Sequence, residues 1–418
     1  MAKIHYARVN DRGELVLPSH FARKLGITPG DEIRIEPNGH GAHLHPSVHD
    51  LKRVYVEVTN KCNLNCGTCM RNVWDVEYGH MRVDVFEQLL GGLENCQEKP
   101  EIFIGGYGEP LSHPNILRLI EQAKGRGFRV IMITNGVLLT QAVARRLIDL
   151  KLDMLWVSLD GASAKCYADV RLGDMLPVVL SNLVNLRSLK YQQFGLSIWN
   201  GFPRLGIAFV AMKRNIHDLG EVIRMGSRLG ATEFSVSNVL AHNESLLEEN
   251  LYTRSLDMLA GQEIRPTIHI PQMDVEPVTL RALGEVMRDL NQVELTGSFL
   301  NRDVEQCPFL ERGSLAVRWD GKVSPCLPLL YTHEHYLGDR KRTSREFFVG
   351  AVGDKGLLEI WNDPDYRTLR KRLQGFDFSP CAVCNSCEMA LENMQDCFGN
   401  TQPTCGGCLW AQGLIRCP

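Results

Sequence analysis

Short apolar stretches alternate with amphipathic ones from residue 53 to about residue 290. The apolar stretches are rich in Val and Ile and predict β-strands, whereas stretches with apolar residues three or four positions apart predict α-helices. Six such β/α units follow one another, and their predicted strands are VYVEV, EIFIGG, RVIMIT, MLWVSLD, LGIAFVAM and EFSVSNV. A further apolar stretch around residue 268 and a helix-like segment over 280–290 extend the series.

The predicted strands are apolar on both faces, which is typical of parallel strands covered by helices. Strands and helices that alternate in series indicate an α/β fold with a parallel sheet, here a partial TIM-like (β/α)6 barrel. Since crossovers between parallel strands are right-handed, functional loops are expected at the carboxyl ends of the strands.

Two segments flank this region. Residues 1–47 contain short strand-like stretches separated by turn residues and predict a small β-rich module. After about residue 300 the β/α pattern fades, and Cys, Gly and Pro become frequent. We therefore expect three domains, over residues 1–47, 48–300 and 301–418.

Composition narrows the class of protein. The 418 residues carry a net charge of −3, which gives no general electrostatic reason to bind nucleic acid or an anionic membrane. No apolar run approaches the length that spans a bilayer, and the start MAKIHYARVN lacks the apolar core of a signal peptide, so a cytoplasmic protein is expected. Fourteen cysteines are unusual there, because disulfides are disfavoured in a reducing compartment. They indicate binding of metal ions or clusters.

Three cysteines lie close together in VTNKCNLNCGTCM, directly after the first predicted strand. Cys62, Cys66 and Cys69 could bind three irons of a cubane and leave the fourth iron open to a substrate or cofactor. The alternative is a zinc site, but zinc needs a fourth ligand, and only His80 follows nearby.

This cysteine spacing, together with GGYGEP after the second strand, resembles the radical S-adenosylmethionine (SAM) superfamily over residues 53 to about 300. The resemblance implies that the three cysteines hold a [4Fe–4S] cluster. It also implies a set of SAM-contacting residues, namely Gly105, Gly106, Tyr107, Gly108, Glu109, Asn135, Ser158, Asp160 and Arg171. One position departs from the family, because Thr68 stands where an aromatic residue often packs on the adenine.

Nine of the remaining cysteines also follow a pattern, whereas Cys96 and Cys166 are isolated and are more simply small packing residues. Cys307 is followed by thirteen residues, Gly321, four residues and Cys326, and a cysteine-dense tail comes after them. This arrangement resembles the SPASM domain, which holds up to two auxiliary [4Fe–4S] clusters; zinc ribbons are the alternative. The resemblance implies Cys307, Cys326 and Cys408 on an inner cluster and Cys384, Cys387, Cys405 and Cys417 on an outer one, with Cys381 and Cys397 unassigned.

The segment DRGELVLPSHFARKLGITPGDEIRIEP resembles the swapped-hairpin modules of AbrB-type regulators. Such modules dimerise and often bind DNA. The module carries six basic and five acidic side chains, a weak basis for phosphate binding, so dimerisation or protein docking is favoured over DNA binding.

Family resemblance implies the chemistry. Radical SAM enzymes reductively cleave SAM to a 5′-deoxyadenosyl radical, with electrons from a donor such as ferredoxin or flavodoxin, and SPASM members mostly modify peptides or proteins. The strings CMRNVWDVEYGHM and PTCGGCLWAQGLIRCP further resemble maturases of tungsten-cofactor aldehyde oxidoreductases. We therefore expect a maturase of such an oxidoreductase or its cofactor, working in an anaerobic or strongly reducing cytoplasm.

Two alternatives stay open. One is a maturase of a ribosomally synthesised peptide, which forms thioether or carbon–carbon crosslinks. The other is an iron–sulfur redox sensor that binds DNA through the N-terminal module. The sequence identifies no catalytic acid or base. Candidates for substrate-site acids or relays are Asp75, Tyr107, Asp320 and Tyr331, but nothing in the sequence sets them apart from ordinary polar residues.

Overall fold

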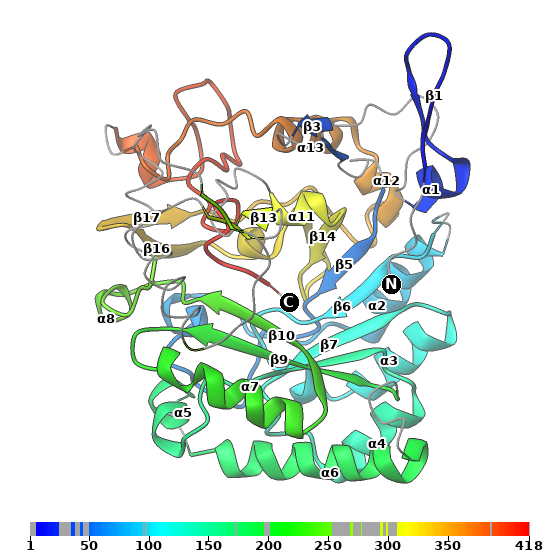
Figure 1. Ribbon diagram of the computed structural model, residues 1–418, viewed down its shortest axis with the longest axis vertical. Coiled ribbons are helices and arrows are strands. Elements are labelled where there is room, and N and C mark those ends of the chain that lie inside the picture. Colours follow the sequence, from blue (N-terminus) through cyan, green and yellow to red (C-terminus); the bar gives the residue numbers. More distant parts are fainter. Residues whose placement is uncertain are drawn as a thin grey trace.

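A nine-stranded sheet organises the computed structural model (Figure 1). Its strands lie in the order β10-β9-β8-β7-β6-β5-β14-β15-β18. The structure describes residues 6–24, 35–37, 42–44, 50–94, 96, 98–171, 174–195, 201–252, 268–270, 277, 293–295, 298–299, 307–384 and 387–417.

Six neighbouring strands are parallel and follow one another in sequence order, as the apolar pattern predicted. They are β5 (Arg53–Val56), β6 (Glu101–Ile104), β7 (Val130–Thr134), β8 (Met154–Ser158), β9 (Arg204–Ala211) and β10 (Ala231–Asn238). The expected partial (β/α)6 barrel is confirmed. Beyond β5 the sheet continues with a parallel strand and two antiparallel ones, β14 (Ser314–Val317), β15 (Lys322–Ser324) and β18 (Gly350–Ala351).

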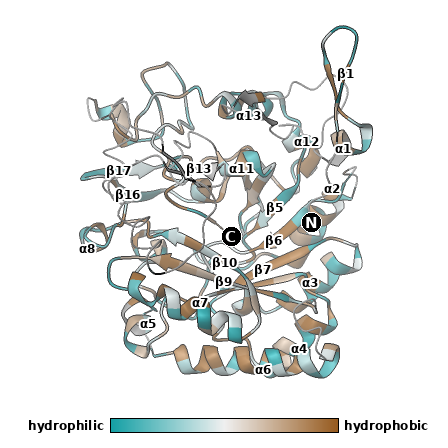
Figure 2. Cartoon of the chain, viewed as in Figure 1, coloured by the Kyte–Doolittle hydropathy of each residue, from teal (hydrophilic) through white to brown (hydrophobic). Residues whose placement is uncertain are grey.

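Helices that follow the parallel strands cover one side of the sheet (Figure 1). They are α2 (Val83–Leu93), α3 (Ile116–Gly125), α4 (Gln141–Asp149), α5 (Ala164–Arg171), α6 (Leu176–Phe194) and α7 (Leu219–Arg228). On α2, Phe86, Leu89, Leu90 and Leu93 are fully buried, at the three- and four-residue spacing that places side chains on one helix face. The strands β6, β7 and β9 are predominantly hydrophobic in Figure 2.

The other side of the sheet is covered by the C-terminal part of the chain (Figure 1). Side chains alternate along β5, so that Val54 and Val56 join the helix-side core while Tyr55 joins a second core. This second core also contains Phe103 from β6 and Phe309 from the C-terminal part. Two-sided burial therefore explains why the strands read as continuous apolar runs.

The C-terminal part consists of short elements. They are α11 (Pro308–Glu311), the antiparallel hairpin of β16 (His333–Leu337) and β17 (Arg340–Ser344), α12 (Leu357–Trp361) and α13 (Pro364–Gly375). Because β14 pairs with β5 inside the large sheet, this part and the barrel share hydrogen bonds as well as a core.

In sequence, two small elements follow the barrel strands and precede the C-terminal part. They are α8 (Glu244–Leu247) and a sheet of β11 (Ile268–Ile270), β12 (Val293–Leu295) and β13 (Ser298–Phe299). The strand expected near residue 268 is thus present, whereas the helix expected over 280–290 lies outside the described residues. Among the described helices, none is both long and apolar enough to cross a membrane.

The N-terminal module contains two antiparallel hairpins and a short helix. The first hairpin pairs β1 (Arg8–Val9) with β2 (Leu15–Val16) and projects from the body (Figure 1). Helix α1 (Ser19–Lys24) follows, and β3 (Ile35–Pro37) pairs with β4 (Ala42–Leu44). Exposed apolar side chains on the first hairpin, such as Val9 (69%) and Leu15 (54%), are compatible with the expected swapped-hairpin dimer, which stays a prediction.

Dimerisation through this hairpin can be tested with Leu15→Asp. If Leu15 is buried between two copies, a charge there should raise the dimer dissociation constant about tenfold or more, because burying a Leu contributes about 1.5–3 kcal/mol. Light scattering after size exclusion would measure the change. Val184→Asp alters a similarly exposed apolar residue on α6 and should leave the dimer intact; equal behaviour of the two variants would contradict the assignment.

Candidate functional site

A cavity of about 1250 Å3, counting its solvent-open mouth, lies at the carboxyl ends of the parallel strands. Residues from the loop after β5 and from the ends of β6, β7, β8 and β10 line it. The lining includes Cys62, Cys66, Cys69, Gly106, Tyr107, Gly108, Glu109, Asn135, Ser158, Asp160 and Arg171. Of the expected cluster- and SAM-contacting residues, only Gly105 does not line this cavity. Residues more than 100 positions apart in sequence therefore surround one space.

The cysteine loop after β5 is held from both sides. Asn60 donates from its side chain to the Glu77 carbonyl (2.8 Å) and accepts from the Gly79 amide (2.8 Å). The Cys69 amide donates to the Cys66 carbonyl (3.1 Å), and the Gly67 amide donates to the Val170 carbonyl on α5 (3.0 Å). These bonds keep the three thiols on one wall of the cavity.

Each of the three sulfur atoms has a nearby hydrogen-bond donor. The Leu64 amide lies 3.4 Å from Cys62 Sγ, Arg71 Nε lies 3.3 Å from Cys69 Sγ, and an Arg171 guanidinium nitrogen lies 3.7 Å from Cys66 Sγ. Burial raises the pKa of the Cys66 thiol, and the Arg171 charge partly offsets this. Arg71 is a residue that the motif reading missed, although its position two residues after the third cysteine is visible in the sequence.

The donor set fits an anionic iron–sulfur cluster with one open iron. Three thiols and two guanidinium groups can hold and partly neutralise the cluster, and the open cavity gives the fourth iron space for a ligand. His80, the candidate fourth zinc ligand, does not line this cavity and packs its ring edge-on against His113 at 5.2 Å. The zinc alternative therefore loses its expected ligand.

Glu109 is almost fully buried at the cavity wall and ties three elements together. Its carboxylate accepts from the Leu111 amide (3.0 Å), the Thr134 hydroxyl (2.7 Å) and the Asn135 amide (2.7 Å). Burial raises the pKa of Glu109, while the bonds from Asn135 and Thr134 act in the opposite direction. The carboxylate is thus fixed at the end of β7, where it faces the cavity.

The glycines of GGYGEP allow close packing against other parts of the protein. A Cβ on Gly108 would lie 2.1 Å from the Thr59 carbonyl oxygen, and one on Gly106 would lie 2.7 Å from the Glu57 side chain. Gly105 would meet Ile133 at 2.5 Å. We expected these glycines to admit a ligand, but their first requirement is the approach of this loop to β5 and the cysteine loop.

Asp160 and Arg171 form a buried ion pair beside Cys66. Arg171 Nη2 lies 2.5 Å from Asp160 Oδ2, and Asp160 Oδ1 accepts from the Val210 amide at 2.8 Å. Burial lowers the pKa of Arg171, but Asp160 and Cys66 raise it by more, so the guanidinium stays charged. Its Nε is buried and has no hydrogen-bond partner, which leaves a donor for a ligand in the cavity.

Next to the cavity, Glu57 packs together with Trp74, Tyr107 and Tyr331. The sequence did not predict that these four side chains form one group. Tyr331 donates from its hydroxyl to the fully buried Glu57, and the Tyr107 amide donates to the same carboxylate (3.1 Å). Trp74 stacks on Tyr331 with ring centroids 4.2 Å apart and meets Tyr107 edge-on at 4.8 Å. Of the polar candidates, Tyr331 thus belongs to a packed group, and Asp320 pairs with Arg318 at 2.6 Å.

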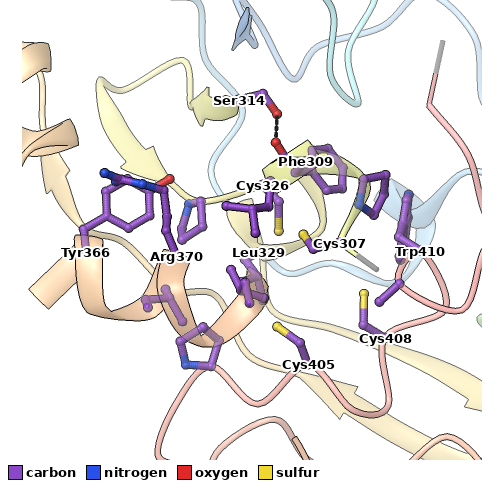
Figure 3. Close-up of a pocket in the computed structure, with 17 residues that line it drawn as sticks. Cys307, Phe309, Ser314, Cys326, Leu329, Tyr366, Arg370, Cys405, Cys408 and Trp410 are labelled. Carbon is purple, nitrogen blue, oxygen red and sulfur yellow. Dashed lines mark hydrogen bonds between the residues drawn. The ribbon is translucent and has the colours of Figure 1, made fainter. Parts of the chain in front are cut away.

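A second pocket lies in the C-terminal part, and four thiols point into it (Figure 3). Cys307 and Cys326 flank β14 and β15 in sequence, and Cys405 and Cys408 come from the tail. Burial raises the pKa of all four thiols, to about 12 for Cys307, so without metal they are protonated. Iron bound to thiolates would replace these protons, and four convergent thiols match the ligand count of one cubane.

This grouping differs from the expected one at Cys405. The sequence pattern assigned Cys405 to the outer cluster with Cys384, Cys387 and Cys417, whereas the structure gathers it with the inner cysteines. The physical reason is the turn at Gly406 and Gly407, which puts Cys405 and Cys408 on one side; the Cys408 amide donates to the Cys405 carbonyl at 3.0 Å.

The other C-terminal cysteines lie outside this pocket. Cys381 is buried and lies 3.0 Å from the Ser379 hydroxyl, Cys384 is half-buried, and Cys387 and Cys397 are exposed. Cys417 lines the first cavity instead. An outer cluster therefore stays a prediction, without an assembled ligand set among the described residues.

The tail that carries Cys417 also contributes to the wall of the first cavity. Trp410, Ile415, Arg416 and Cys417 line it. The Arg416 amide donates to the Ser237 hydroxyl (3.0 Å), and Asn238 donates to the Leu414 carbonyl (2.7 Å), which joins the tail to the end of β10. On the opposite side Arg312 donates to the Cys417 carbonyl (3.2 Å). The C-terminus accordingly lies beside β10 and β14 in Figure 1.

The buried Glu57 predicts a pH dependence of stability. Burial raises its pKa to about 7, whereas an unfolded chain releases this proton near 4.5. Between these values the folded state holds more protons, so the free energy of unfolding should fall as pH rises, by up to about 3 kcal/mol. Glu57→Gln should remove the contribution of this carboxyl group to the fall in the free energy of unfolding. Thermal unfolding of the anaerobically reconstituted protein from pH 5 to 8 would measure the change.

Tyr331→Phe serves as the matched variant. It keeps Glu57 buried but removes the hydroxyl that stabilises the carboxylate, so the pKa of Glu57 should rise further. The fall in the free energy of unfolding should then extend to higher pH. Profiles that coincide for the wild type and Glu57→Gln would contradict the assignment.

Comparison with known proteins matches two segments of the chain to iron–sulfur protein families, in agreement with the two groups of thiols. Residues 56–203 match the radical SAM superfamily, and residues 307–388 match the SPASM iron–sulfur cluster-binding domain. A tungsten-containing aldehyde ferredoxin oxidoreductase cofactor-modifying protein from Pyrococcus furiosus is 28% identical over 377 residues, which cover 88% of this chain and 97% of that protein.

Two further relatives are more distant or partial. The mycofactocin maturase MftC of Mycobacterium tuberculosis (strain H37Rv) is 30% identical over 176 residues, 42% of each chain. Among solved structures, native anSMEcpe with bound AdoMet has a TM-score of 0.51 at 16% identity, covering 85% of this chain and 90% of that one. This likeness concerns the fold.

The first matched segment carries Cys62, Cys66 and Cys69, and the second begins at Cys307 and contains Cys326. The other two thiols of the second site, Cys405 and Cys408, follow this segment in sequence. The cofactors of this chain are accordingly [4Fe–4S] clusters and SAM. The chain is therefore an enzyme with a radical SAM domain, and a SPASM domain follows it.

Proposed function

We propose that this enzyme reductively cleaves SAM and uses the resulting radical to mature a tungsten-containing aldehyde oxidoreductase or its pterin cofactor. The observation that carries the proposal is the convergence of three cysteine thiols, Glu109 and the Asp160–Arg171 pair on one cavity at the barrel rim. The relative from Pyrococcus furiosus, which aligns over nearly its whole length, supports the choice of target.

In this proposal Cys62, Cys66 and Cys69 ligate the SAM-binding cluster. When bound, that cluster supplies the electron that cleaves the sulfonium bond of SAM to give a 5′-deoxyadenosyl radical. Arg71 and Arg171 stabilise the thiolates through charge-assisted hydrogen bonds. Their positive charge favours the reduced, more negative state of the site.

The cavity wall would orient SAM by its charged groups. Glu109 presents a fixed carboxylate for the SAM ammonium group, and the unpartnered Nε of Arg171 can donate to the SAM carboxylate. Asn135 donates from its side chain to Asn63 at 2.9 Å and thereby links the end of β7 to the cysteine loop. Because these groups are held by other hydrogen bonds, little reorganisation is needed on binding.

Thr68 and Tyr107 also line the cavity. Thr68 cannot stack on adenine as an aromatic residue would, so the apolar walls, Ile133, Val239 and Leu240 among them, are left to contact the adenosine moiety. The tail residues Trp410 and Ile415 exclude water from the opposite side, which protects a radical from side reactions.

The four thiols of Cys307, Cys326, Cys405 and Cys408 would ligate one auxiliary cluster. The Trp74, Tyr107 and Tyr331 group would be its neighbour, since Tyr107 donates from its hydroxyl to the Leu327 carbonyl, next to Cys326. An electron donor such as ferredoxin or flavodoxin would supply the first electron. An auxiliary cluster held by these four thiols would supply an acceptor for the electron that leaves the substrate.

A peptide maturase is the second candidate. The mycofactocin maturase MftC is 30% identical over part of the chain, which supports a maturase role for the shared region. The two candidates differ in substrate, so 5′-deoxyadenosine formation in the presence of each partner distinguishes them.

SAM cleavage can be tested by Cys66→Ala. Anaerobically reconstituted protein should form 5′-deoxyadenosine when reduced with dithionite, and the variant should lose at least a hundredfold in rate because the cluster has lost one of three ligands. Liquid chromatography of the products provides the measurement. Cys96→Ala removes a thiol outside both cluster sites and should keep the activity; a Cys66→Ala variant that still cleaves SAM would refute the catalytic assignment.

The auxiliary grouping can be tested by iron counting. Cys405→Ala and Cys326→Ala should each remove the same cluster, a loss of about four irons, and leave the same spectrum by electron paramagnetic resonance. The double variant should lose no more iron than either single one. Loss of different signals in the two variants would assign Cys405 to an outer cluster instead.

A further inference from the structure

Three side chains outside both thiol sites converge on the protein surface. Cys166 Sγ lies 3.4 Å from His217 Nε2, and Asp218 Oδ1 lies 3.6 Å from the same nitrogen. Their ligand atoms all lie within 4.8 Å of one another. Within the described part of the chain, no other group of three His, Cys, Asp or Glu side chains is so arranged.

Two neighbouring strand ends bring these residues together. Cys166 lies on α5, which follows β8, and His217 and Asp218 lie in the 3-10 turn Ile216–Asp218, which follows β9. Because β8 and β9 are adjacent and parallel, the segments that follow them emerge side by side. Residues 51 positions apart in sequence thus share one site.

The Asp218 carboxylate is held in place by bonds to its other oxygen. Oδ2 accepts from the Ala162 amide (2.9 Å), the Ser163 amide (3.1 Å) and the Ser163 hydroxyl (3.3 Å). These three donors leave Oδ1 directed toward His217. Carboxylate ligands of metal ions are oriented by such outer bonds.

The distances match the edges of a tetrahedral zinc site. With zinc bonds of about 2.3 Å to sulfur and 2.0–2.1 Å to nitrogen and oxygen, neighbouring tetrahedral ligands lie about 3.3–3.6 Å apart. The observed sulfur–nitrogen and nitrogen–oxygen separations fall at this spacing. The Nε2 atom of His217 thus faces both the Cys166 sulfur and the Asp218 carboxylate oxygen, the arrangement that three ligands of one metal ion would have.

We propose that Cys166, His217 and Asp218 bind a zinc ion, with a water molecule as the fourth ligand. A sulfur, nitrogen and oxygen set suits a borderline-soft divalent cation and disfavours Mg2+ and Ca2+, which prefer oxygen ligands. Binding displaces the thiol proton of Cys166 to solvent, and no electron moves. The side chain of His217 is 64% exposed, which gives the ion an entry path.

Such an ion would join α5 to the loop after β9. Helix α5 also carries Arg171, which contacts Cys66 and Asp160, and Asn215 in the β9 loop donates to the Asp160 carbonyl at 3.0 Å. The zinc site is therefore a clamp near the cavity, and it does not contact the proposed cluster ligands.

Zinc content and zinc spectroscopy test the proposal on the iron-loaded protein. The probe is one equivalent of Zn2+, followed by removal of free metal, elemental analysis and X-ray absorption at the zinc edge, where iron does not interfere. We expect one zinc per chain with one sulfur at about 2.3 Å and nitrogen or oxygen at about 2.0 Å. Cys166→Ala and His217→Gln should each lose this zinc while keeping the wild-type iron count.

Cys96→Ala is the matched control, because it removes another thiol that lies outside both cluster sites, and it should retain the zinc. A wild-type protein that binds no zinc would overturn the proposal. So would a zinc ion surrounded by four sulfur atoms, which would place it at the C-terminal thiols, or zinc retained by Cys166→Ala. The unchanged iron count separates loss of this site from misfolding and from failure of the proposed SAM chemistry.

Discussion

The constraint on which the site depends is the stabilisation of three closely spaced, partly buried thiolates, those of Cys62, Cys66 and Cys69. Thiolates within one short loop repel one another, and burial in a medium of low dielectric constant increases the cost of their charge. Arg71 and Arg171 provide positive charge at Cys69 and Cys66, and Arg171 is itself held by the buried Asp160. The position of Asp160 in turn depends on the pairing of β8 with β9, because Asp160 follows β8 and accepts a hydrogen bond from the Val210 amide of β9. The barrel thus supplies a framework in which charge on the cluster ligands can be balanced.

The sheet was predictable because its physical requirement is periodic. Strands covered on both sides must be apolar at successive positions, and the sequences of β5 to β9 show this directly. The edge strand β10 is more polar and only partly buried. The addition of β14 beside β5 was not predictable, because this pairing joins strands about 260 residues apart and no local pattern encodes it. The same holds for the shared core of Tyr55 and Phe309.

The candidate site was predictable where spacing is local. The residues of the cysteine loop and of GGYGEP are adjacent in sequence, and they line one cavity. The sequence suggested that the glycines of GGYGEP admit a ligand. Their packing role was not predictable, because only the folded chain reveals that Gly108 lies against the Thr59 carbonyl. Glu57 was missed because a single acidic residue in an apolar strand gives no motif, although its burial makes it one of the most perturbed carboxyl groups. Cys166 was interpreted as a packing residue, and its contact with His217 depends on two loops that meet only in the fold.

The position of the tail has a consequence for biosynthesis. Trp410 and Arg416 form part of the wall of a cavity whose opposite wall begins at Cys62, so about 350 residues separate the two walls. Chains leave the ribosome from the N-terminus, and barrel units can fold as they emerge. The cysteine loop therefore spends most of translation with one side open, and an iron–sulfur donor can reach it directly. Once the tail pairs with Ser237 and Asn238, access narrows, which makes the order of cluster delivery and tail docking a determinant of how much protein matures.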